Sequence, residues 1–204
     1  MFAAIQNWRR QSTYGDPIVV VSGLPRSGTS MMMRMLDAGG LGTVTDGIRT
    51  ADIDNPKGYF ELERIKDLEK EADKSYIRQS RGKVIKVISF LLKDLPPDNF
   101  YQVLFMRRDL DEVLKSQDKM IEHRQADDPT QNDTLKEAYR NHIVSVRRMV
   151  RNAPNFAIHE VFYAQCVSSP GQVATEVNAF LGGRLDAAKM TAAVDPSLYR
   201  NKSG

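Results

Sequence analysis

The chain of 204 residues contains a single cysteine, Cys166, and no long run of apolar residues. One cysteine cannot form a disulfide within the chain, so the protein does not require an oxidising compartment. No stretch approaches the roughly 18 apolar residues that a membrane-spanning helix needs. The apolar run at the N-terminus is too short for a secretory signal, and its arginines follow that run instead of preceding it. These absences predict a cytoplasmic protein without a membrane span.

A large excess of charge of one sign is also missing. Lys and Arg number 29 and Asp and Glu number 26, which leaves a net charge of +3. Nucleic-acid-binding domains usually carry a denser basic surface, so we expect the ligand to be an anionic small molecule and not a nucleic acid. The hydrophobic content of 41% is ordinary for a globular protein, and the length suits one domain with a full core.

Short β-branched runs alternate along the chain with segments of helical periodicity. The expected strands cover residues 17–23, 83–90, 101–106 and 155–162. The expected helices cover residues 2–12, 29–37, 61–77, 109–121, 134–150 and 172–181. Buried strands that alternate with helices predict an α/β fold, a single three-layer domain with a central parallel sheet and helices on both faces.

The stretch "VVVSGLPRSGTS", residues 19–30, is typical of a strand that turns through glycines into a helix. In a parallel sheet such a turn lies at the carboxyl edge, where ligands bind. Its backbone amides and the helix N-terminus form a cradle for an anion, and the hydroxyls of Thr29 and Ser30 can donate to phosphate oxygens. Gly23 and Gly28 permit the tight turn. The alternative is a turn that uses its glycines for geometry alone.

The loop lacks the lysine that ATP- and GTP-binding loops carry after the second glycine. That lysine contacts the β- and γ-phosphates, and a strand-end aspartate helps to hold Mg²⁺. Here Gly28 is followed by Thr29, the cation of the loop is Arg26, and the third strand ends in Arg107 and Arg108. Arginine binds phosphate directly through paired, charge-assisted hydrogen bonds. This pattern argues against a nucleoside triphosphatase and predicts a nucleotide with phosphates at two separate places.

The same residues carry a family resemblance. "GLPRSGTS" resembles the 5′-phosphosulfate loop of sulfotransferases that use 3′-phosphoadenosine 5′-phosphosulfate (PAPS), and "MRRDLDEVLKS" resembles their 3′-phosphate motif. That motif is an arginine at a strand end with a serine eight residues later, the spacing of Arg108 and Ser116. "HEVFYAQCVSSPGQVATEVNAFLGG" is similar to a third segment and puts Tyr163 where the family has an aromatic residue near the adenine.

The resemblance covers about residues 17–182 and implies a P-loop-like nucleotide-binding core, followed by a C-terminal tail over 183–204. It implies PAPS as the donor, 3′-phosphoadenosine 5′-phosphate (PAP) as the product, and no required metal. The implied donor-binding residues are Pro25, Arg26, Ser27, Gly28, Thr29, Ser30, Arg108, Ser116 and Tyr163. Arg26 would stabilise the bridging oxygen, where negative charge grows as the bond to sulfur breaks. Alternation along the strand leaves one of Arg107 and Arg108 facing away from the site, and the resemblance assigns Arg108 to the nucleotide.

The sequence departs from the family at the general base. "KVIKVISFLLKDLP" resembles the segment that carries a lysine and, two residues on, a catalytic histidine. Lys86 matches the lysine, but Ile88 occupies the histidine position. Some branches of the family use a glutamate from the region of "DNPKGYFELE", so Glu61 is our candidate base and is expected near Arg26 and Lys86. Its alternative role is an acid at a helix N-terminus, where acids are favoured.

Two further residues are weighed at the reacting centre. His159, expected at a strand end, is the alternative base, and Lys57 is a candidate contact for the sulfonate. The acceptor pocket is expected to form from residues 40–60, 124–134 and the C-terminal tail.

We therefore expect a sulfotransferase that moves a sulfuryl group by metal-free in-line displacement to a hydroxyl or amine of a small-molecule acceptor. Lys86 and Glu61 would serve the reacting centre. Two alternatives stay open. One is a P-loop small-molecule kinase, which needs ATP and Mg²⁺. The other is a non-catalytic nucleotide-binding module, which Ile88 in the histidine position favours.

Overall fold

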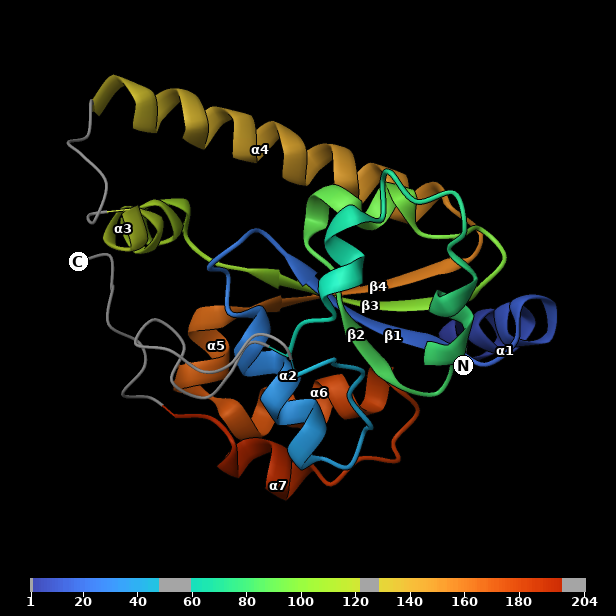
Figure 1. Ribbon diagram of the computed structural model, residues 1–204. Helices are drawn as coiled ribbons and strands as arrows, with labels where there is room; N and C mark the ends of the chain where they lie inside the picture. Colours follow the sequence, from blue (N-terminus) through green and yellow to red (C-terminus); the bar gives the residue numbers. More distant parts are fainter. Residues whose placement is uncertain (1, 48–59, 122–128, 196–204) are drawn as a thin grey trace.

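The computed structural model of the chain describes residues 2–47, 60–121 and 129–195 (Figure 1). Its centre is a four-stranded parallel sheet with the strand order β2-β1-β3-β4. The strands are β1 (Ile18–Gly23), β2 (Val84–Lys86), β3 (Tyr101–Arg107) and β4 (Phe156–Phe162). The parallel sheet between two layers of helices confirms the predicted α/β fold class.

Helices cover both faces of the sheet (Figure 1). One face carries α2 (Thr29–Ala38), α5 (Tyr163–Ser168), α6 (Pro170–Phe180) and α7 (Ala187–Ala192). The other face carries α4 (Pro129–Asn152) and the 3-10 helices η1 (Glu63–Asp67), η2 (Ser75–Ser80) and η3 (Ser89–Asp94). The remaining helices are α1 (Phe2–Tyr14) and α3 (Leu110–Ile121). In the described ranges, no helix has the length and apolar character needed to cross a membrane.

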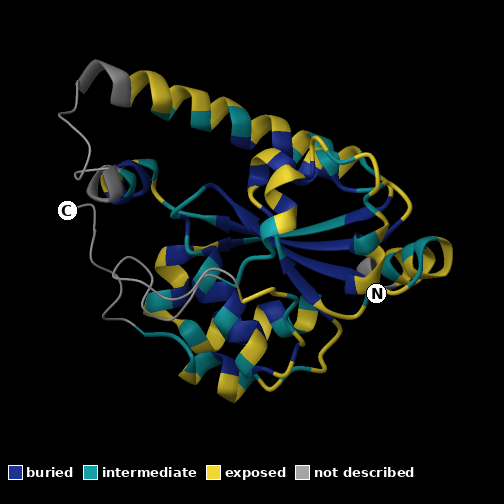
Figure 2. Ribbon diagram, viewed as in Figure 1, coloured by how far each residue is buried: buried dark blue, intermediate teal, exposed yellow. Residues whose placement is uncertain are grey.

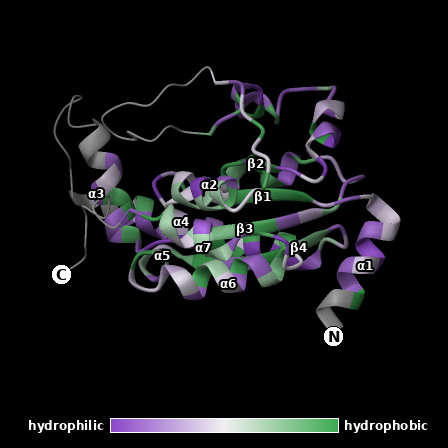
Figure 3. Cartoon of the chain, turned by 90° about the horizontal axis from the view of Figure 1, so that it is seen from below, coloured by the Kyte–Doolittle hydropathy of each residue, from purple (hydrophilic) through white to green (hydrophobic). Residues whose placement is uncertain are grey.

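Alternation along the strands supplies two separate cores. Val19 and Val21 of β1 point to the face of α2, whereas Ile18 and Val20 point to the face of α4. All four side chains are buried, as the β-branched run predicts for a strand covered on both faces. β1 and β3 form the dark blue centre of Figure 2 and lie in the hydrophobic centre of Figure 3, whereas β4 is mostly of intermediate exposure. The core therefore fixes the sheet rigidly, and the carboxyl ends of the strands are left to build a site.

The helix predicted over residues 61–77 is wrong. Two short 3-10 helices, η1 and η2, lie there with turns between them. The side chain of Asp73 accepts a hydrogen bond from the Ser75 amide (2.9 Å), and such a local bond competes with helical hydrogen bonding. Ile65 and Ile77 are still buried in the core. The apolar spacing over residues 61–77 therefore predicted correctly that these side chains are buried, but not that they belong to one continuous helix.

The strand predicted over residues 83–90 is shorter than expected. The Val87 amide makes the last bond to β1, on the Val21 carbonyl (3.0 Å), and η3 begins at Ser89. The buried Ser89 hydroxyl lies 2.9 Å from Nε2 of His142 on α4. At this point the chain leaves the edge of the sheet and contacts α4.

Two helices were not anticipated. α5 begins at Tyr163, directly after β4, and α7 lies within 183–204. The side chain of Asp186 accepts from the Lys189 amide (3.0 Å) and caps α7. Met190 is fully buried in the core shared with α2 and α6. The chain beyond residue 182 thus contributes to the core through α7.

Candidate active site

The site predicted from the sequence lies at the carboxyl edge of the sheet. The loop after β1 and the start of α3 after β3 meet there, because β1 and β3 are neighbours. The chain passes to β2 on one side of β1 and to β3 on the other, so the order of the strands reverses at this point. In open α/β sheets such a reversal leaves a crevice in which ligands bind.

The loop after β1 is held in an unusual backbone conformation. Arg26 has φ 67° and Gly28 has φ 98°, and a Cβ on Gly28 would lie only 2.4 Å from Cδ2 of Tyr163. Gly28 caps α2 without any side-chain hydrogen bond, so the amides of the first turn are not capped by a side chain. Backbone strain of this kind clusters at functional sites. The helix N-terminus and its amides are suited to an anion.

The side chains of the loop differ in exposure. Pro25, Arg26 and Ser30 are half-buried, whereas Ser27 and Thr29 are buried. The Ser27 hydroxyl has no hydrogen-bond partner among the described residues. A buried polar group without a partner is rare in native proteins and calls for an explanation such as a ligand or an ordered water.

Arg26 connects the loop to α3. Its Nε donates to Oγ of the buried Ser116 at 2.9 Å, and its carbonyl accepts from Nη1 of Arg108 at 3.1 Å. Arg26 thus contacts both residues of the motif "MRRDLDEVLKS". The loop and the Arg108–Ser116 motif form one cluster of donors.

Arg108 is held from two further sides. Its Nε donates to Oε2 of Glu112 (2.9 Å), and both side chains are less than a tenth exposed. Its guanidinium lies 4.4 Å from the centre of the Tyr163 ring. Burial raises the pKa of the Tyr163 hydroxyl, and Arg108 opposes that rise only in part. Glu112 was missed in the sequence, although its spacing of four from Arg108 on a helix is typical of an ion pair.

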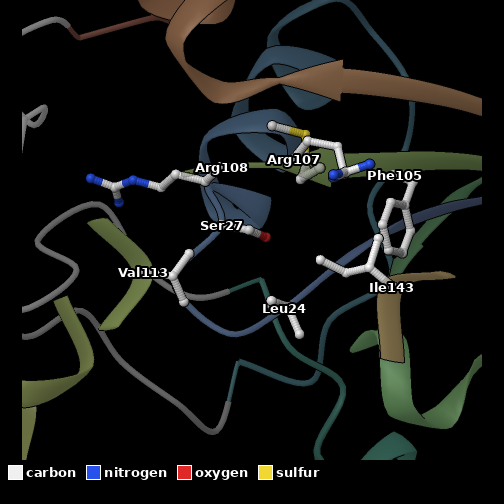
Figure 4. A pocket seen from close by; sticks show the side chains of 8 residues that line it. Leu24, Ser27, Phe105, Arg107, Arg108, Val113 and Ile143 are labelled. Carbon is white, nitrogen blue, oxygen red and sulfur yellow. The ribbon is translucent and has the colours of Figure 1, made fainter. Parts of the chain in front are cut away.

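Arg107 points away from the loop, in the direction opposite to Arg108 (Figure 4). Its Nη1 lies 2.7 Å from Oε2 of Glu160 on β4. Glu160 also pairs with Arg147 (2.7 Å) and Arg151 (3.5 Å) of α4. The sequence prediction assigned Arg108 to the loop side and Arg107 to the other, and the structure has this arrangement.

Glu61 and Lys86 are in direct contact, as the sequence analysis expected. Nζ of Lys86 lies 3.0 Å from Oε1 of Glu61 and donates to Oγ of Ser30 at 3.2 Å. The second carboxylate oxygen of Glu61 lies 3.3 Å from Nζ of Lys66. Ser30 belongs to the loop after β1, so Lys86 joins the carboxylate to the anion cradle. Arg26, also expected near Glu61, instead directs its Nε to Ser116.

The backbone around Glu61 is fixed by a neighbouring segment. The Glu61 carbonyl accepts from the Thr45 hydroxyl (2.9 Å), and Asp46 accepts from the Glu63 amide (2.6 Å). Phe60 has φ 51°, a value that bulky residues rarely adopt. Strained backbone therefore occurs both in the loop and beside the carboxylate.

The two described histidines lie away from the cluster. His142 contacts Ser89 and stacks on Phe90 with ring centres 3.9 Å apart, and burial lowers its pKa. The His159 ring stacks on Phe180 at 5.3 Å, and burial lowers its pKa as well. His159 lies in the middle of β4, paired with Leu104 of β3, so its predicted place at a strand end is wrong. Its ring faces Phe180 of α6 and not the carboxyl edge. Lys57 and His123 lie outside the described residues.

A narrow pocket opens under the loop (Figure 4). Its lining includes Leu24, Ser27, Val113 and Ile143, together with residues at the end of β3. The pocket has no room for even a water molecule, so it is a packing gap and not the ligand site. Ser27 and Arg108 border this gap, whereas Arg26 and Ser30 of the same loop are not part of its lining.

Comparisons with known proteins find similarity in the fold but not in the sequence. No protein-family profile matches the chain, and no curated protein matches its sequence. Solved structures do match. The sulfotransferase domain of the Synechococcus PCC 7002 olefin synthase has a TM-score of 0.53 and 18% identity, over 92% of this chain and 84% of that chain. A sulfotransferase from Alicyclobacillus acidocaldarius has a TM-score of 0.51 and 16% identity, over 89% of this chain and 87% of that chain.

A third structure, retinol dehydratase in complex with androsterone and inactive cofactor PAP, has a TM-score of 0.48 and 17% identity, over 92% of this chain and 67% of that chain. The first two matches extend over most of this chain and of each matched chain. Their sequence identity is low, so these matches show a shared arrangement of helices and strands and nothing further. The chain has the sulfotransferase fold.

Proposed function

We propose that the protein is a sulfotransferase that moves a sulfuryl group from PAPS to a hydroxyl or amine of a small-molecule acceptor. One observation carries this proposal. The loop after β1 and the Arg108–Ser116 motif after β3 meet through the side chain and the carbonyl of Arg26. Two phosphate-binding elements joined at one edge suit a nucleotide that carries phosphate at both its 5′ and 3′ positions. The sulfotransferase fold supports the same reading.

The donor would bind along this edge. The loop amides, Thr29 and Ser30 would hold the 5′-phosphosulfate at the N-terminus of α2. Arg108 and Ser116 would hold the 3′-phosphate. A guanidinium has five N–H donors in a rigid fork, so Arg108 can serve Glu112, the loop carbonyl and a phosphate together. Tyr163 would support Arg108 through its ring and line the nucleotide side of the site.

The reaction would be a direct displacement at sulfur. The acceptor oxygen or nitrogen forms a bond to sulfur while the bond from sulfur to the bridging oxygen breaks, and the electron pair of that bond stays on the 5′-phosphate of PAP. Arg26 and the loop amides would stabilise this growing charge. Arg26 would have to turn from Ser116 toward the bridging oxygen when the donor binds.

The acceptor proton would go to Glu61. The carboxylate lies beside Lys86, and Lys86 also contacts Ser30 of the loop. Lys86 would face the sulfonate oxygens, and Glu61 would face the acceptor on the far side of the sulfur. A positioned base of this kind typically contributes about 10²–10⁴-fold to the rate. The products are the sulfated acceptor, PAP and one proton.

The end of β3 disfavours the kinase alternative. A P-loop kinase holds Mg²⁺ with a strand-end aspartate. Here β3 ends at Arg107, and Arg108 follows it and is directed at the loop. We therefore propose that the donor is bound without metal.

The proposal is tested by turnover. The protein is incubated with PAPS and a panel of alcohols, phenols and amines in the presence of EDTA, and PAP and sulfated products are measured by mass spectrometry. We expect PAP to form in step with one class of acceptor. Consumption of ATP that requires Mg²⁺, with no use of PAPS, would establish the kinase alternative. Tight binding of PAP with no turnover of PAPS by any acceptor would establish the non-catalytic module.

A further inference from the structure

Glu61 is held by two lysines, one on each carboxylate oxygen. Lys86 lies 3.0 Å from Oε1 and Lys66 lies 3.3 Å from Oε2. The two cations come from different elements, since Lys86 ends β2 and Lys66 belongs to η1. The proposed reaction uses only the first of them.

The two lysines differ in how far their side chains are exposed and in their other partners. The Lys86 side chain is 9% exposed and is also bonded to Ser30, whereas the Lys66 side chain is 49% exposed. Lys66 has a second partner, because its Nζ donates to both carboxylate oxygens of Glu63 at 2.6 and 2.7 Å. Glu63 and Glu61 therefore share one ammonium group.

We propose that Lys66 is a positioning residue for Glu61, one that keeps the carboxylate oriented and ionised when Lys86 engages the sulfonate, and that Glu63 tunes this effect by competing for the same ammonium. The inference rests on the proposed function. If Lys86 turns to the transferring group, Oε1 becomes available for the acceptor proton. Lys66 then remains on Oε2 and fixes the carboxylate plane.

Several charges on the described segments around Glu61 enter this account. Lys86 faces Glu61 from β2, Lys66 and Glu63 face it from η1, and Asp46 lies behind, bonded to the Glu63 amide. Burial would lower the pKa of Lys66, but hydrogen bonds to Glu63 and Glu61 outweigh it and raise that pKa. Lys66 thus stays charged throughout the range in which a carboxylate titrates.

The experiment measures the pKa of Glu61 directly, by NMR titration of the side-chain carboxyl carbon in the full chain. Its signal is assigned by its loss in Glu61→Gln. We expect Lys66→Met to raise the pKa of Glu61 by about 0.5–1 unit, because a partly exposed opposite charge is lost. Glu63→Gln should lower it, because a competing negative charge is lost. Lys66→Arg should keep the wild-type value.

The matched control is Lys70→Met. Lys70 is an exposed lysine four residues on, paired with Asp67 at 3.1 Å. The Lys70→Met variant should leave the pKa of Glu61 unchanged. Opposite shifts in Lys66→Met and Glu63→Gln cannot arise from a general loss of structure. No shift in either variant, or equal shifts in Lys66→Met and Lys70→Met, would overturn the inference.

Activity supplies the second measurement. With a verified acceptor, the acid limb of the pH profile of kcat should move upward by the same amount in Lys66→Met, since a base must be ionised to accept a proton. If Lys66→Met is active and its pH profile of kcat does not move, the positioning role of Lys66 is contradicted, but the proposed function is not. The absence of PAPS turnover in the wild-type protein contradicts the proposed function, while the NMR titration still decides whether Lys66 controls Glu61.

Discussion

Nε of Arg26 donates to Oγ of Ser116 at 2.9 Å, across 90 positions of sequence. The first residue belongs to the loop proposed for the 5′-phosphosulfate, and the second belongs to the motif proposed for the 3′-phosphate. The cation that would serve the leaving group thus rests on a residue of the other phosphate site. We expect the donor to separate this pair, with its 3′-phosphate taking Ser116.

Ser116→Ala should weaken the binding of PAP much more than that of 5′-AMP. The hydroxyl would donate to the 3′-phosphate, and a hydrogen bond to a charged group is worth about 1.5–3 kcal/mol. The dissociation constant of PAP should rise about 10- to 100-fold in calorimetric titrations. Lys115→Ala, at an exposed neighbouring position of α3, is the control and should bind PAP normally. Equal weakening for PAP and 5′-AMP would contradict this role of Ser116.

Arg108→Ala should destabilise the fold strongly, because it leaves the buried Glu112 carboxylate without its cation. Breaking such a pair costs about 3–5 kcal/mol. Arg107→Ala should cost about 1 kcal/mol or less, since Glu160 keeps Arg147. Urea unfolding of both variants measures the difference.

The double variant Arg108→Met with Glu112→Leu separates stability from binding. It removes both buried charges, so most of the stability should return. PAP binding should not return, because the guanidinium is still absent. If Arg107→Ala weakens PAP binding more than the double variant does, the wrong arginine has been assigned to the nucleotide.

Gly28→Ala should be more costly than Gly182→Ala, although both glycines have nearly the same backbone angle. Their φ values are 98° and 97°, so each alanine adopts a left-handed conformation at about 1–2 kcal/mol. Only at Gly28 does the new Cβ meet a side chain, Cδ2 of Tyr163, whereas nothing lies within 4 Å of it at Gly182. The free energy of unfolding should therefore fall by about 1–3 kcal/mol more in Gly28→Ala. Equal losses would mean that Tyr163 moves freely and does not support the loop.

Local patterns in the sequence predicted the loop after β1 and the Arg108–Ser116 motif, which the structure brings into contact. The β-branched run of β1, the two glycines and the eight-residue spacing of Arg108 and Ser116 are all properties of short segments. The conformation of such segments depends mainly on residues that are close in the sequence, so it can be predicted without knowing the rest of the fold. Alternation along β3 also assigned opposite sides to Arg107 and Arg108.

Contacts across the chain could be predicted only in part. The pairing of Glu61 with Lys86 followed from the family resemblance, but the second lysine, Lys66, did not. The apolar spacing over residues 61–77 predicted one helix, which would have pointed Lys66 elsewhere. Tertiary burial of Ile65 and Ile77 in two 3-10 helices overrode that local preference. Glu112 was missed for a related reason, because a spacing of four indicates an ion pair with Arg108 but does not show that the pair will be buried.

Glu61→Gln should preserve binding of PAP and reduce turnover by about 10²–10⁴-fold on a verified acceptor. The amide keeps the shape of the side chain but cannot accept the proton. Glu69→Gln, an exposed glutamate of the same region, is the control and should have wild-type turnover. Full turnover in Glu61→Gln would remove Glu61 as the base.

The most direct test of the account is a calorimetric titration of the wild-type protein with PAP, 5′-AMP and ATP in the presence of EDTA. Two joined phosphate sites predict that PAP binds without metal and about 10- to 100-fold more tightly than 5′-AMP, the usual value of one charged contact. Equal affinity for PAP and 5′-AMP, or tighter binding of ATP that appears only when Mg²⁺ is restored, would contradict it.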